Sequence, residues 1–209
     1  MRKLILRQNM SADGFVGGPN GEIDWIFRSF DDSAMAWTVE TLWQVGVHIM
    51  GSRTFRDMAA HWPRSTEPIA APMNEIPKVV FTRKGLEPAA PTTQALADAT
   101  RLRPQGSDAP TPSMLASWTN PGVARGELGA EIARLKQQPG KPILAHGGAS
   151  FARSLVRERL PDEYWLLVYP VALGRGLPLF TELEKPLDLK LVRTTAFDGG
   201  VVEQIYRPA

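Results

Sequence analysis

Short apolar runs alternate with amphipathic segments along most of this chain. The first run, Leu4-Ile5-Leu6, is apolar at consecutive positions, and the runs around Val80 and Leu144 are similar. Strands without an alternating polar face are typical of a sheet that is covered on both sides. Strands are expected over 3–10, 47–50, 78–82, 142–146 and 163–173. Pro170, inside the last of these, indicates an edge strand or a bulge.

In the amphipathic segments between these runs, apolar residues recur at the period of a helix. Leu128, Ile132 and Leu135 are spaced by four and three residues, which predicts a helix over 127–138. Ser and Asp side chains can accept a hydrogen bond from a free N–H at a helix start, so they are good caps. Helices capped by Asp32 or Ser33 and by Ser52 are expected over 33–46 and 52–62, and a further helix over 149–159.

The chain ends in two strand-like runs, 187–195 and 200–207, joined by Phe197-Asp198-Gly199-Gly200. An Asp-Gly pair between two strands is a strong hairpin signal. The whole order therefore predicts an α/β fold with a mixed, mostly parallel sheet and an antiparallel C-terminal hairpin at its edge.

Three segments interrupt this pattern. Residues 63–77 contain four prolines and are expected to be a loop or a broken helix. Residues 85–122 are rich in Pro, Ala, Thr, Ser and Gly, which predicts an excursion inside one domain of residues 1–209. Residues 11–21 hold four glycines, which predicts either a lid or cofactor-facing loop or a mobile surface loop.

Composition excludes several functions. A net charge of +2 over 209 residues is too small to indicate nucleic-acid binding. The absence of cysteine excludes disulfides, a thiolate nucleophile and Cys-ligated zinc, and the three histidines match no metal motif. No apolar run approaches the length of a membrane span, and the first residues do not resemble a signal peptide. A cytoplasmic protein without a metal is expected.

The junction at Gly147-Gly148 is a candidate anion site. It follows an apolar strand and precedes a helix that starts near Ala149 and Ser150. Free N–H groups at a helix start and the positive end of the helix dipole attract phosphate, and glycine permits a close approach. The alternative is a plain tight turn. The motif is neither the G-x-G-x-x-G fingerprint nor a P-loop.

Two further strand ends carry similar chemistry. Arg53, in Gly51-Ser52-Arg53-Thr54, lies in the first turn of a predicted helix, where a cation opposes the dipole and a bound anion would explain it. Thr82 is the last residue of the predicted strand that includes Phe81, and Arg83 follows it. In a parallel sheet these ends share one rim, and a pyrophosphate with one further phosphate would account for all of them. NADP(H) has that chemistry, so hydride transfer is a natural reaction.

The chain resembles the dihydrofolate-reductase-like family, and in particular the C-terminal reductase domain of bacterial riboflavin biosynthesis. Six motifs carry the resemblance and occur in the family's order. They are Ser11-Ala12-Asp13-Gly14-Phe15-Val16, Gly18-Pro19-Asn20-Gly21-Glu22-Ile23-Asp24-Trp25, Met50-Gly51-Ser52-Arg53-Thr54-Phe55, Pro77-Lys78-Val79-Val80-Phe81-Thr82-Arg83, Ile143-Leu144-Ala145-His146-Gly147-Gly148-Ala149-Ser150 and Tyr169-Pro170-Val171-Ala172-Leu173-Gly174-Arg175-Gly176.

The resemblance implies a sheet of about eight strands between helices, a homodimer, and NADPH as cofactor. It implies that Ala12 and Val16 lie by the nicotinamide. It also implies the remaining cofactor contacts: Gly51, Ser52, Arg53, Thr54, Phe81, Thr82 and Arg83 at the adenosine end, and Gly147, Gly148, Ala149 and Ser150 at the pyrophosphate. Asn9, Trp25 and Arg175 are candidate substrate residues.

The chain departs from classical dihydrofolate reductases at one position. Their carboxylate lies five residues after the loop tryptophan; here that residue is Phe30, and the acids Asp31 and Asp32 follow it. Asp31 is therefore a candidate catalytic group. Asp13 is a second candidate for proton handling, although an Asx turn is an alternative role.

An NADPH-dependent reductase of a small heterocyclic substrate, such as a pterin, a folate or a ribosylaminopyrimidine, is the leading hypothesis. The alternative is a non-catalytic NADP(H)-binding or redox-sensing module, which the missing carboxylate favours. A serine hydrolase would need Gly-x-Ser-x-Gly around Ser150, and Gly-Gly-Ala-Ser-Phe does not match.

Overall fold

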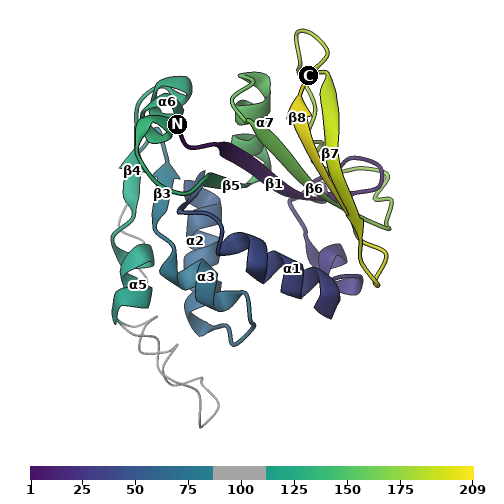
Figure 1. Ribbon diagram of the computed structural model, residues 1–209, viewed down its shortest axis with the longest axis horizontal. Helices are drawn as coiled ribbons and strands as arrows, with labels where there is room; N and C mark the ends of the chain where they lie inside the picture. Colours follow the sequence, from purple (N-terminus) through teal and green to yellow (C-terminus); the bar gives the residue numbers. More distant parts are fainter. Residues whose placement is uncertain (87–111) are drawn as a thin grey trace.

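The computed structural model describes residues 1–86 and 112–209, and these form an eight-stranded sheet with helices on both faces (Figure 1). The strand order is β4-β3-β2-β5-β1-β6-β8-β7. The strands are β1 (Leu4–Ser11), β2 (Val47–Gly51), β3 (Lys78–Phe81), β4 (Gly122–Ala124), β5 (Ile143–Gly147), β6 (Glu163–Tyr169), β7 (Leu189–Ala196) and β8 (Val202–Pro208). The helices are η1 (Asp24–Arg28), α1 (Asp32–Leu42), α2 (Ser52–His61), η2 (Trp62–Arg64), α3 (Ala70–Glu75), α5 (Pro112–Thr119), α6 (Leu128–Gln137) and α7 (Ala149–Arg157).

Strand β1 lies in the middle of the sheet and is buried on both faces, as the sequence predicts (Figure 1). Leu4 and Leu6 pack with α6 and α7, whereas Ile5 packs with the layer formed by α1, α2, α3 and α5. Because side chains alternate along a strand, the odd-numbered positions of β1 face the α1–α3 layer. This alternation decides which side chains of neighbouring strands reach the same cavity.

The predicted fold class is confirmed. The six strands from β4 to β6 pair in parallel, while β8 is antiparallel to both β6 and β7. Phe197 and Gly200 close the expected hairpin, with Phe197 N–H donating to the carbonyl of Val201 at 2.8 Å. β6 ends at Tyr169, so Pro170 follows the strand and does not mark an edge or a bulge within it.

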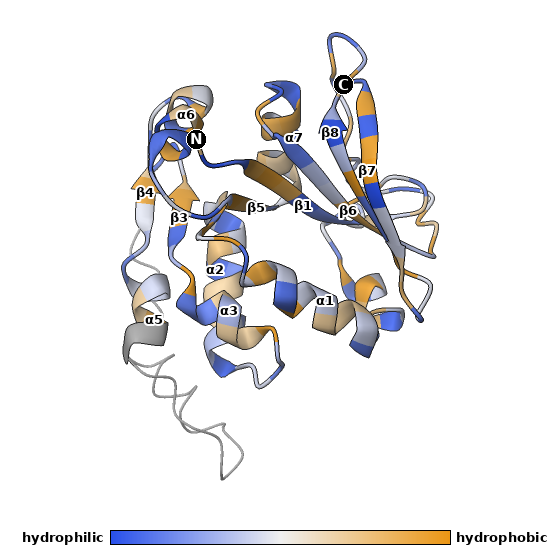
Figure 2. Ribbon diagram, in the orientation of Figure 1, coloured by the Kyte–Doolittle hydropathy of each residue, from blue (hydrophilic) through white to orange (hydrophobic). Residues whose placement is uncertain are grey.

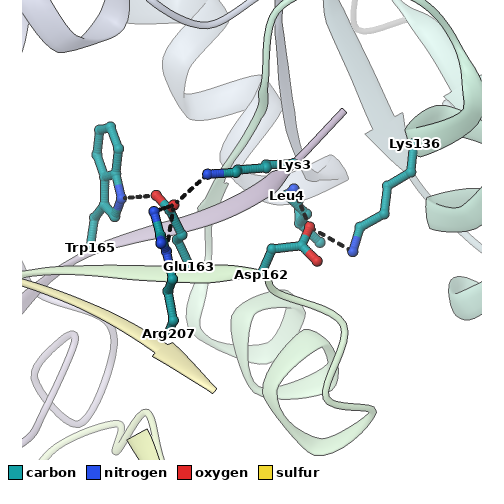
Figure 3. Close-up of polar contacts among 7 residues, drawn as sticks. All are labelled: Lys3, Leu4, Lys136, Asp162, Glu163, Trp165 and Arg207. Atoms are coloured by element: carbon teal, nitrogen blue, oxygen red, sulfur yellow. Dashed lines mark hydrogen bonds and ion pairs between the residues drawn. The ribbon is translucent and has the colours of Figure 1, made fainter. Parts of the chain in front are cut away.

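A polar network fixes the amino ends of β1 and β6 (Figure 3). The Glu163 carboxylate accepts hydrogen bonds from Lys3 at 3.1 Å, Arg207 at 2.9 Å and Trp165 at 3.0 Å. Burial opposes ionisation of Glu163, but these donors outweigh it together and keep its pKa below the ordinary value. The network ties β1, β6 and β8 together at the rim opposite the carboxyl ends of the parallel strands.

Two proline-rich segments contain more structure than the sequence indicates. Helix α3 lies within residues 63–77, and the segment 85–122 includes α5 and the start of β4. Trp118 of α5 is 1% exposed, and its Nε1 donates to Asn74 Oδ1 at 2.8 Å. The sequence therefore did not indicate α5 and the start of β4 within the predicted excursion, and the part of it from 87 to 111 lies outside the described residues.

Lys78 is buried beneath α5. Its Nζ donates to the carbonyl of Ile76 at 2.6 Å and to Ser117 Oγ at 2.7 Å, and lies 4.2 Å from the centre of the Trp118 ring. Burial lowers the pKa of Lys78 to about 7. These contacts make α5 part of the core layer.

For both α1 and α2, the residue in the cap position precedes the residue that the sequence predicts as the cap. Asp31, not Asp32 or Ser33, caps α1, because its carboxylate accepts the Ala34 N–H at 2.8 Å. α2 begins at Ser52 itself and has Gly51 in the cap position. Since Gly51 has no side chain, the first N–H groups of α2 are left without a side-chain partner.

Candidate functional site

A cavity of about 1810 Å³ opens along the carboxyl ends of the parallel strands. All six of these strands contribute to its lining. Ligands collect at this edge of open α/β sheets because loops and helix N-termini converge there. The lining includes Asn9 of β1, Gly51 of β2, Phe81 of β3, Ala124 of β4, His146 of β5 and Tyr169 of β6.

Two helices start at this cavity without a side-chain cap. Gly51 and Gly148 are the cap residues of α2 and α7, and both line the cavity. A Cβ on Gly148 would lie 3.0 Å from Thr54 Oγ1, so the two helix starts are closely apposed. Uncapped N–H groups and two dipole ends thus face one space, which suits a diphosphate.

Cations also line this cavity. Arg53 and Arg56 come from α2, Arg83 follows β3, and Arg125 follows β4. Further cations of the lining are Lys84, Arg153 and Arg157. The cavity also has acids, Asp57, Glu67, Glu127 and Glu158, and these are fewer. Arg125 is not among the residues that the sequence predicts, because β4, the strand that places it, is only three residues long.

The other half of the cavity is apolar. Phe27 of η1 is 71% exposed, although it belongs to a large aromatic residue type that usually packs. Apolar side chains from α1, α2, η2 and α3 line the cavity as well. The apolar lining comprises Ile23, Ile26, Phe27, Phe30, Met35, Met58, Trp62, Ile69 and Met73. We call this apolar part of the lining the slot, and an apolar lining of this kind suits a flat heterocyclic ring.

Four polar side chains of the central strands also line the cavity. Arg7 and Asn9 are odd-numbered positions of β1, and so they face the α1–α3 layer. His146 has the same parity in β5 as Leu144, which packs in that layer. Tyr169 reaches the slot from the end of β6. We call Arg7, Asn9, His146 and Tyr169 the polar floor.

The floor has unusual electrostatics. Burial, with the charges of Arg7 and Lys78, lowers the pKa of His146 to about 3. His146 packs edge-to-face on His48 at 4.5 Å, and burial lowers the pKa of His48 as well. Both rings are therefore neutral at pH 7. The Nε2 of His146 is buried without a hydrogen-bond partner among the described residues.

The glycine-rich loop is anchored. Ala12 N–H donates to the carbonyl of Val171, and Val16 N–H donates to the carbonyl of Leu177, at 2.8 and 2.9 Å. Its outer part, Pro19 to Gly21, lines the cavity together with Val16. These contacts fit a loop that faces the site better than a mobile surface loop.

The two candidate catalytic carboxylates have structural contacts and do not line the cavity. Asp13 accepts the Ser11 hydroxyl at 2.6 Å and the N–H groups of Leu173 and Gly174 at 3.1 and 2.7 Å. Asp31 caps α1 and accepts the Gly199 N–H from the hairpin tip. These hydrogen bonds give both groups a structural role in holding loops in place, and their catalytic role stays a prediction.

Four other predicted site residues also lie outside the lining. Trp25 is buried, with Nε1 donating to the carbonyl of Glu22 at 3.1 Å and its ring edge-on to Tyr169. Arg175 is exposed on the loop after β6. Gly147 lies between the lining residues His146 and Gly148 but is not part of the lining, and Ala12 is also outside it. The predicted residues that do line the cavity are Asn9, Val16, Gly51, Ser52, Arg53, Thr54, Phe81, Thr82, Arg83, Gly148, Ala149 and Ser150.

Among the described residues there is no group of three His, Cys, Asp or Glu side chains arranged to hold a metal ion. In that same part of the chain, no helix has the length and apolar character needed to cross a membrane.

The sheet order and the cavity at the carboxyl ends define the class as an α/β protein with a dihydrofolate-reductase-like fold. The family follows from the sequence match. Residues 2–203 match the model of the RibD C-terminal domain, so the chain belongs to the RibD C-terminal (reductase) domain family. The resemblance inferred from the six motifs is thereby confirmed.

Two proteins of Bacillus subtilis (strain 168) are similar over nearly their whole length. YyaP, described as uncharacterized, is 30% identical over 205 residues, which cover 98% of this chain and 94% of YyaP. YwjB, described in the same way, is 28% identical over 202 residues, covering 96% and 95%.

Solved structures share the fold. A putative riboflavin biosynthesis protein from Shewanella sp. PV-4 superposes with a TM-score of 0.67 at 22% identity and 99% coverage of both chains. A diaminohydroxyphosphoribosylaminopyrimidine deaminase/5-amino-6-(5-phosphoribosylamino)uracil reductase from Thermotoga maritima gives 0.64 at 16% identity, covering 100% of this chain and 57% of that one. A pyrimidine reductase-like protein from Corynebacterium diphtheriae NCTC gives 0.62 at 13% identity, with 100% and 92% coverage.

Proposed function

We propose that this protein is an NADPH-dependent reductase that transfers hydride to a small heterocyclic substrate, of the pterin, folate or ribosylaminopyrimidine kind. One observation carries the proposal: a single cavity joins two uncapped helix starts and a group of cations to an apolar slot. The first half suits the phosphates of a dinucleotide, and the second half suits a flat ring. Membership of a reductase domain family supports the same function.

The residues of the first half fit NADPH. The backbone at Gly51, Ser52, Gly148 and Ala149 offers N–H donors to a diphosphate. Arg53, Arg83 and Arg125 are candidates for the additional ribose phosphate, because a guanidinium gives two parallel donors to a phosphate. When bound, NADPH would supply the hydride.

The residues of the second half would position the substrate. The apolar slot excludes water from the ring, which strengthens polar contacts at the floor. The polar floor offers donors and no carboxylate, unlike the site of classical dihydrofolate reductases. Named relatives are consistent with ring reduction, since the Thermotoga maritima protein is named as a reductase of a phosphoribosylaminouracil.

The test is calorimetric titration with NADPH and, separately, with NADH, followed by acceptor-dependent oxidation of NADPH. We expect micromolar binding that prefers NADPH, and turnover with at least one pterin, folate or ribosylaminopyrimidine acceptor. NADPH binding without turnover of any acceptor would favour the non-catalytic module. Failure to bind either nucleotide would overturn both proposals.

We also propose that the protein is a homodimer. Figure 2 shows apolar residues on the edge strand β7, where Leu191 and Val192 are 50% and 46% exposed. An exposed apolar edge strand is prone to pair with another chain. Light scattering after size-exclusion chromatography should give twice the 23.0 kDa mass of the chain, and a monomer mass at micromolar concentration would contradict the proposal.

A further inference from the structure

Gln8 of β1 is an amide side chain in the lining of the cavity. Its Nε2 donates to the carbonyl of His146 at 3.1 Å. This contact fixes the orientation of the amide, because only its nitrogen end can donate to a carbonyl. The oxygen end, Oε1, accepts no hydrogen bond from the described residues and, unlike His146 Nε2, is not fully buried. Gln8 therefore presents one oriented acceptor to the cavity.

The Gln8 amide packs against the start of α7. A Cβ on Gly147 would lie 3.0 Å from Gln8 Nε2 and 3.3 Å from Oε1, and the next residue, Gly148, is the cap residue of α7. Gln8 also lies on the same face of β1 as Leu4 and Leu6, which pack with α6 and α7. The acceptor is thus adjacent to one of the two helix starts that suit a diphosphate.

The order of the strands indicates which half of a dinucleotide would reach Gln8 (Figure 1). Helices α2 and α7 follow β2 and β5, which are neighbours in the sheet, so a diphosphate bound by both helix starts lies between these two strand ends. Arg83 and Arg125 follow β3 and β4, on one side of this pair, and β1 lies on the other side. A dinucleotide whose additional ribose phosphate binds these arginines therefore extends its nicotinamide half toward β1 and Gln8.

The nicotinamide ring carries the group that matches this acceptor, because its carboxamide has an NH2 with two N–H donors. The face of β1 that carries Gln8 is otherwise apolar. Val16, which also lines the cavity, packs with the cluster that contains Leu4 and Leu6. An apolar surface suits the ring, and a single polar group beside it fixes how the ring is oriented.

We propose that Gln8 recognises the carboxamide of the nicotinamide ring, with Oε1 accepting a hydrogen bond from the carboxamide NH2. The inference rests on the proposed function, because it takes NADPH as the cofactor. It deepens that function by assigning a residue that sets the rotation of the ring about its bond to ribose. A ring held in one rotation presents one fixed face to the substrate, which is the positioning that hydride transfer requires.

The test compares three ligands by calorimetric titration into the full chain. NADP⁺ carries the carboxamide, and its 3-acetylpyridine analogue has a methyl group in place of the NH2. The third ligand, 2′-phospho-ADP-ribose, keeps the diphosphate and the additional phosphate but has no nicotinamide. The variants are Gln8→Met and Gln8→Leu, which have no amide. The control is Gln44→Met, at an exposed glutamine outside the lining.

We expect the wild-type protein to bind NADP⁺ on the order of 10-fold more tightly than the acetylpyridine analogue, because the analogue offers no donor to Oε1. Both Gln8 variants should lose this preference and keep the wild-type affinity for 2′-phospho-ADP-ribose, and Gln44→Met should match wild type with every ligand. Equal binding of NADP⁺ and its analogue by the wild-type protein, or an unchanged preference in the Gln8 variants, would overturn the inference. An equal loss for all three ligands would also overturn it, since Gln8 would then only support the turn at Gly147.

The ligand without nicotinamide separates this inference from the reductase proposal. If NADP⁺ and 2′-phospho-ADP-ribose bind but the amide and acetyl groups are not distinguished, the role of Gln8 fails and the reductase proposal stands. If none of the three ligands binds, the reductase proposal fails and this inference fails with it.

A spectroscopic measurement checks the contact directly. The NMR signals of the Gln8 side-chain amide, identified with Gln8→Met, should shift on addition of NADP⁺ and much less on addition of 2′-phospho-ADP-ribose. Equal shifts with the two ligands would contradict a contact between Gln8 and the carboxamide.

Discussion

Arg53 lies in the first turn of α2, where a positive side chain opposes the helix dipole. This unfavourable interaction with the helix dipole is explained if Arg53 binds the additional phosphate of NADPH. Arg53→Ala is expected to weaken NADPH on the order of 10- to 100-fold and NADH much less. Calorimetry with both nucleotides measures the difference. Arg64→Ala, an exposed arginine that does not line the cavity, is the control. Equal losses for both nucleotides would show that Arg53 does not contact that phosphate.

Asp31 is a second residue whose role can be separated by mutation. Because it caps α1 and holds the hairpin tip, Asp31→Ala should lower the urea midpoint while NADPH affinity and turnover per folded molecule persist. Asp32→Ala is the matched control, since Asp32 is exposed and follows the cap. A loss of turnover with an unchanged midpoint would support the catalytic role of Asp31.

The sequence could not decide between these roles for Asp31. A carboxylate before a helix is equally suited to capping and to catalysis, and the choice depends on the contact with Gly199, which is 168 residues away. His146 poses the same problem. Its neighbours in sequence do not reveal that Arg7 lies beside it, because the pairing of β1 with β5 is what joins them.

At the scale of elements, the start of α7 offers the sharpest test of the anion site. Gly148→Ala keeps an ordinary backbone conformation, since φ is −66°, but its methyl group would lie 3.0 Å from Thr54 Oγ1, at the point where the two helix starts meet. We expect NADPH affinity to fall on the order of 10-fold, because the close approach to the backbone N–H groups is lost.

Gly129→Ala in α6 is the control for this change. A Cβ there would make ordinary contacts, the nearest at 3.6 Å from Glu158 Oε2, so binding should be preserved and stability should rise slightly. Unchanged NADPH affinity in Gly148→Ala would contradict the anion site at α7.

Long apolar runs were sufficient to predict β1, β2, β3, β5, β6 and the C-terminal hairpin, and the order of elements indicated the sheet class. Short elements were missed for a physical reason. β4 has three residues and α5 begins at a proline, so neither shows a period, and both depend on tertiary contacts such as Trp118 with Asn74. Arg125 was missed with them.

At the scale of the whole molecule, the buried histidines predict a dependence of stability on pH. Burial is the main cause that lowers the pKa of His48 and His146 below 6.5. As the pH falls, these two histidines therefore bind a proton in the unfolded chain before they do so in the folded chain. The stabilisation that the two neutral rings contribute is complete above pH 6.5 and is lost as the pH falls toward 3. The free energy of unfolding should fall by ~1.4 kcal/mol per pH unit for each histidine that stays neutral.

Urea unfolding between pH 6.5 and 5 measures this slope. Lys78 does not contribute in this range, because with a pKa of about 7 it makes the free energy of unfolding rise with pH only at higher pH. His48→Leu should reduce the slope, because His48 is fully buried and both ring nitrogens have no partner among the described residues. His61→Leu, at an exposed ring, should not. An unchanged slope in His48→Leu would show that this ring is protonated in the folded protein.

The position of β1 has a consequence for the order of folding. Its partners are β5 and β6, so Leu4 pairs with Ile143 and Ile5 with Glu163 (Figure 1). About 140 further residues must be synthesised after β1 before either of its partner strands is available for pairing. Until then an apolar segment remains unpaired, and contacts of such long range slow folding and invite aggregation. The cavity floor, built from β1, β5 and β6, is therefore completed only after most of the chain has left the ribosome.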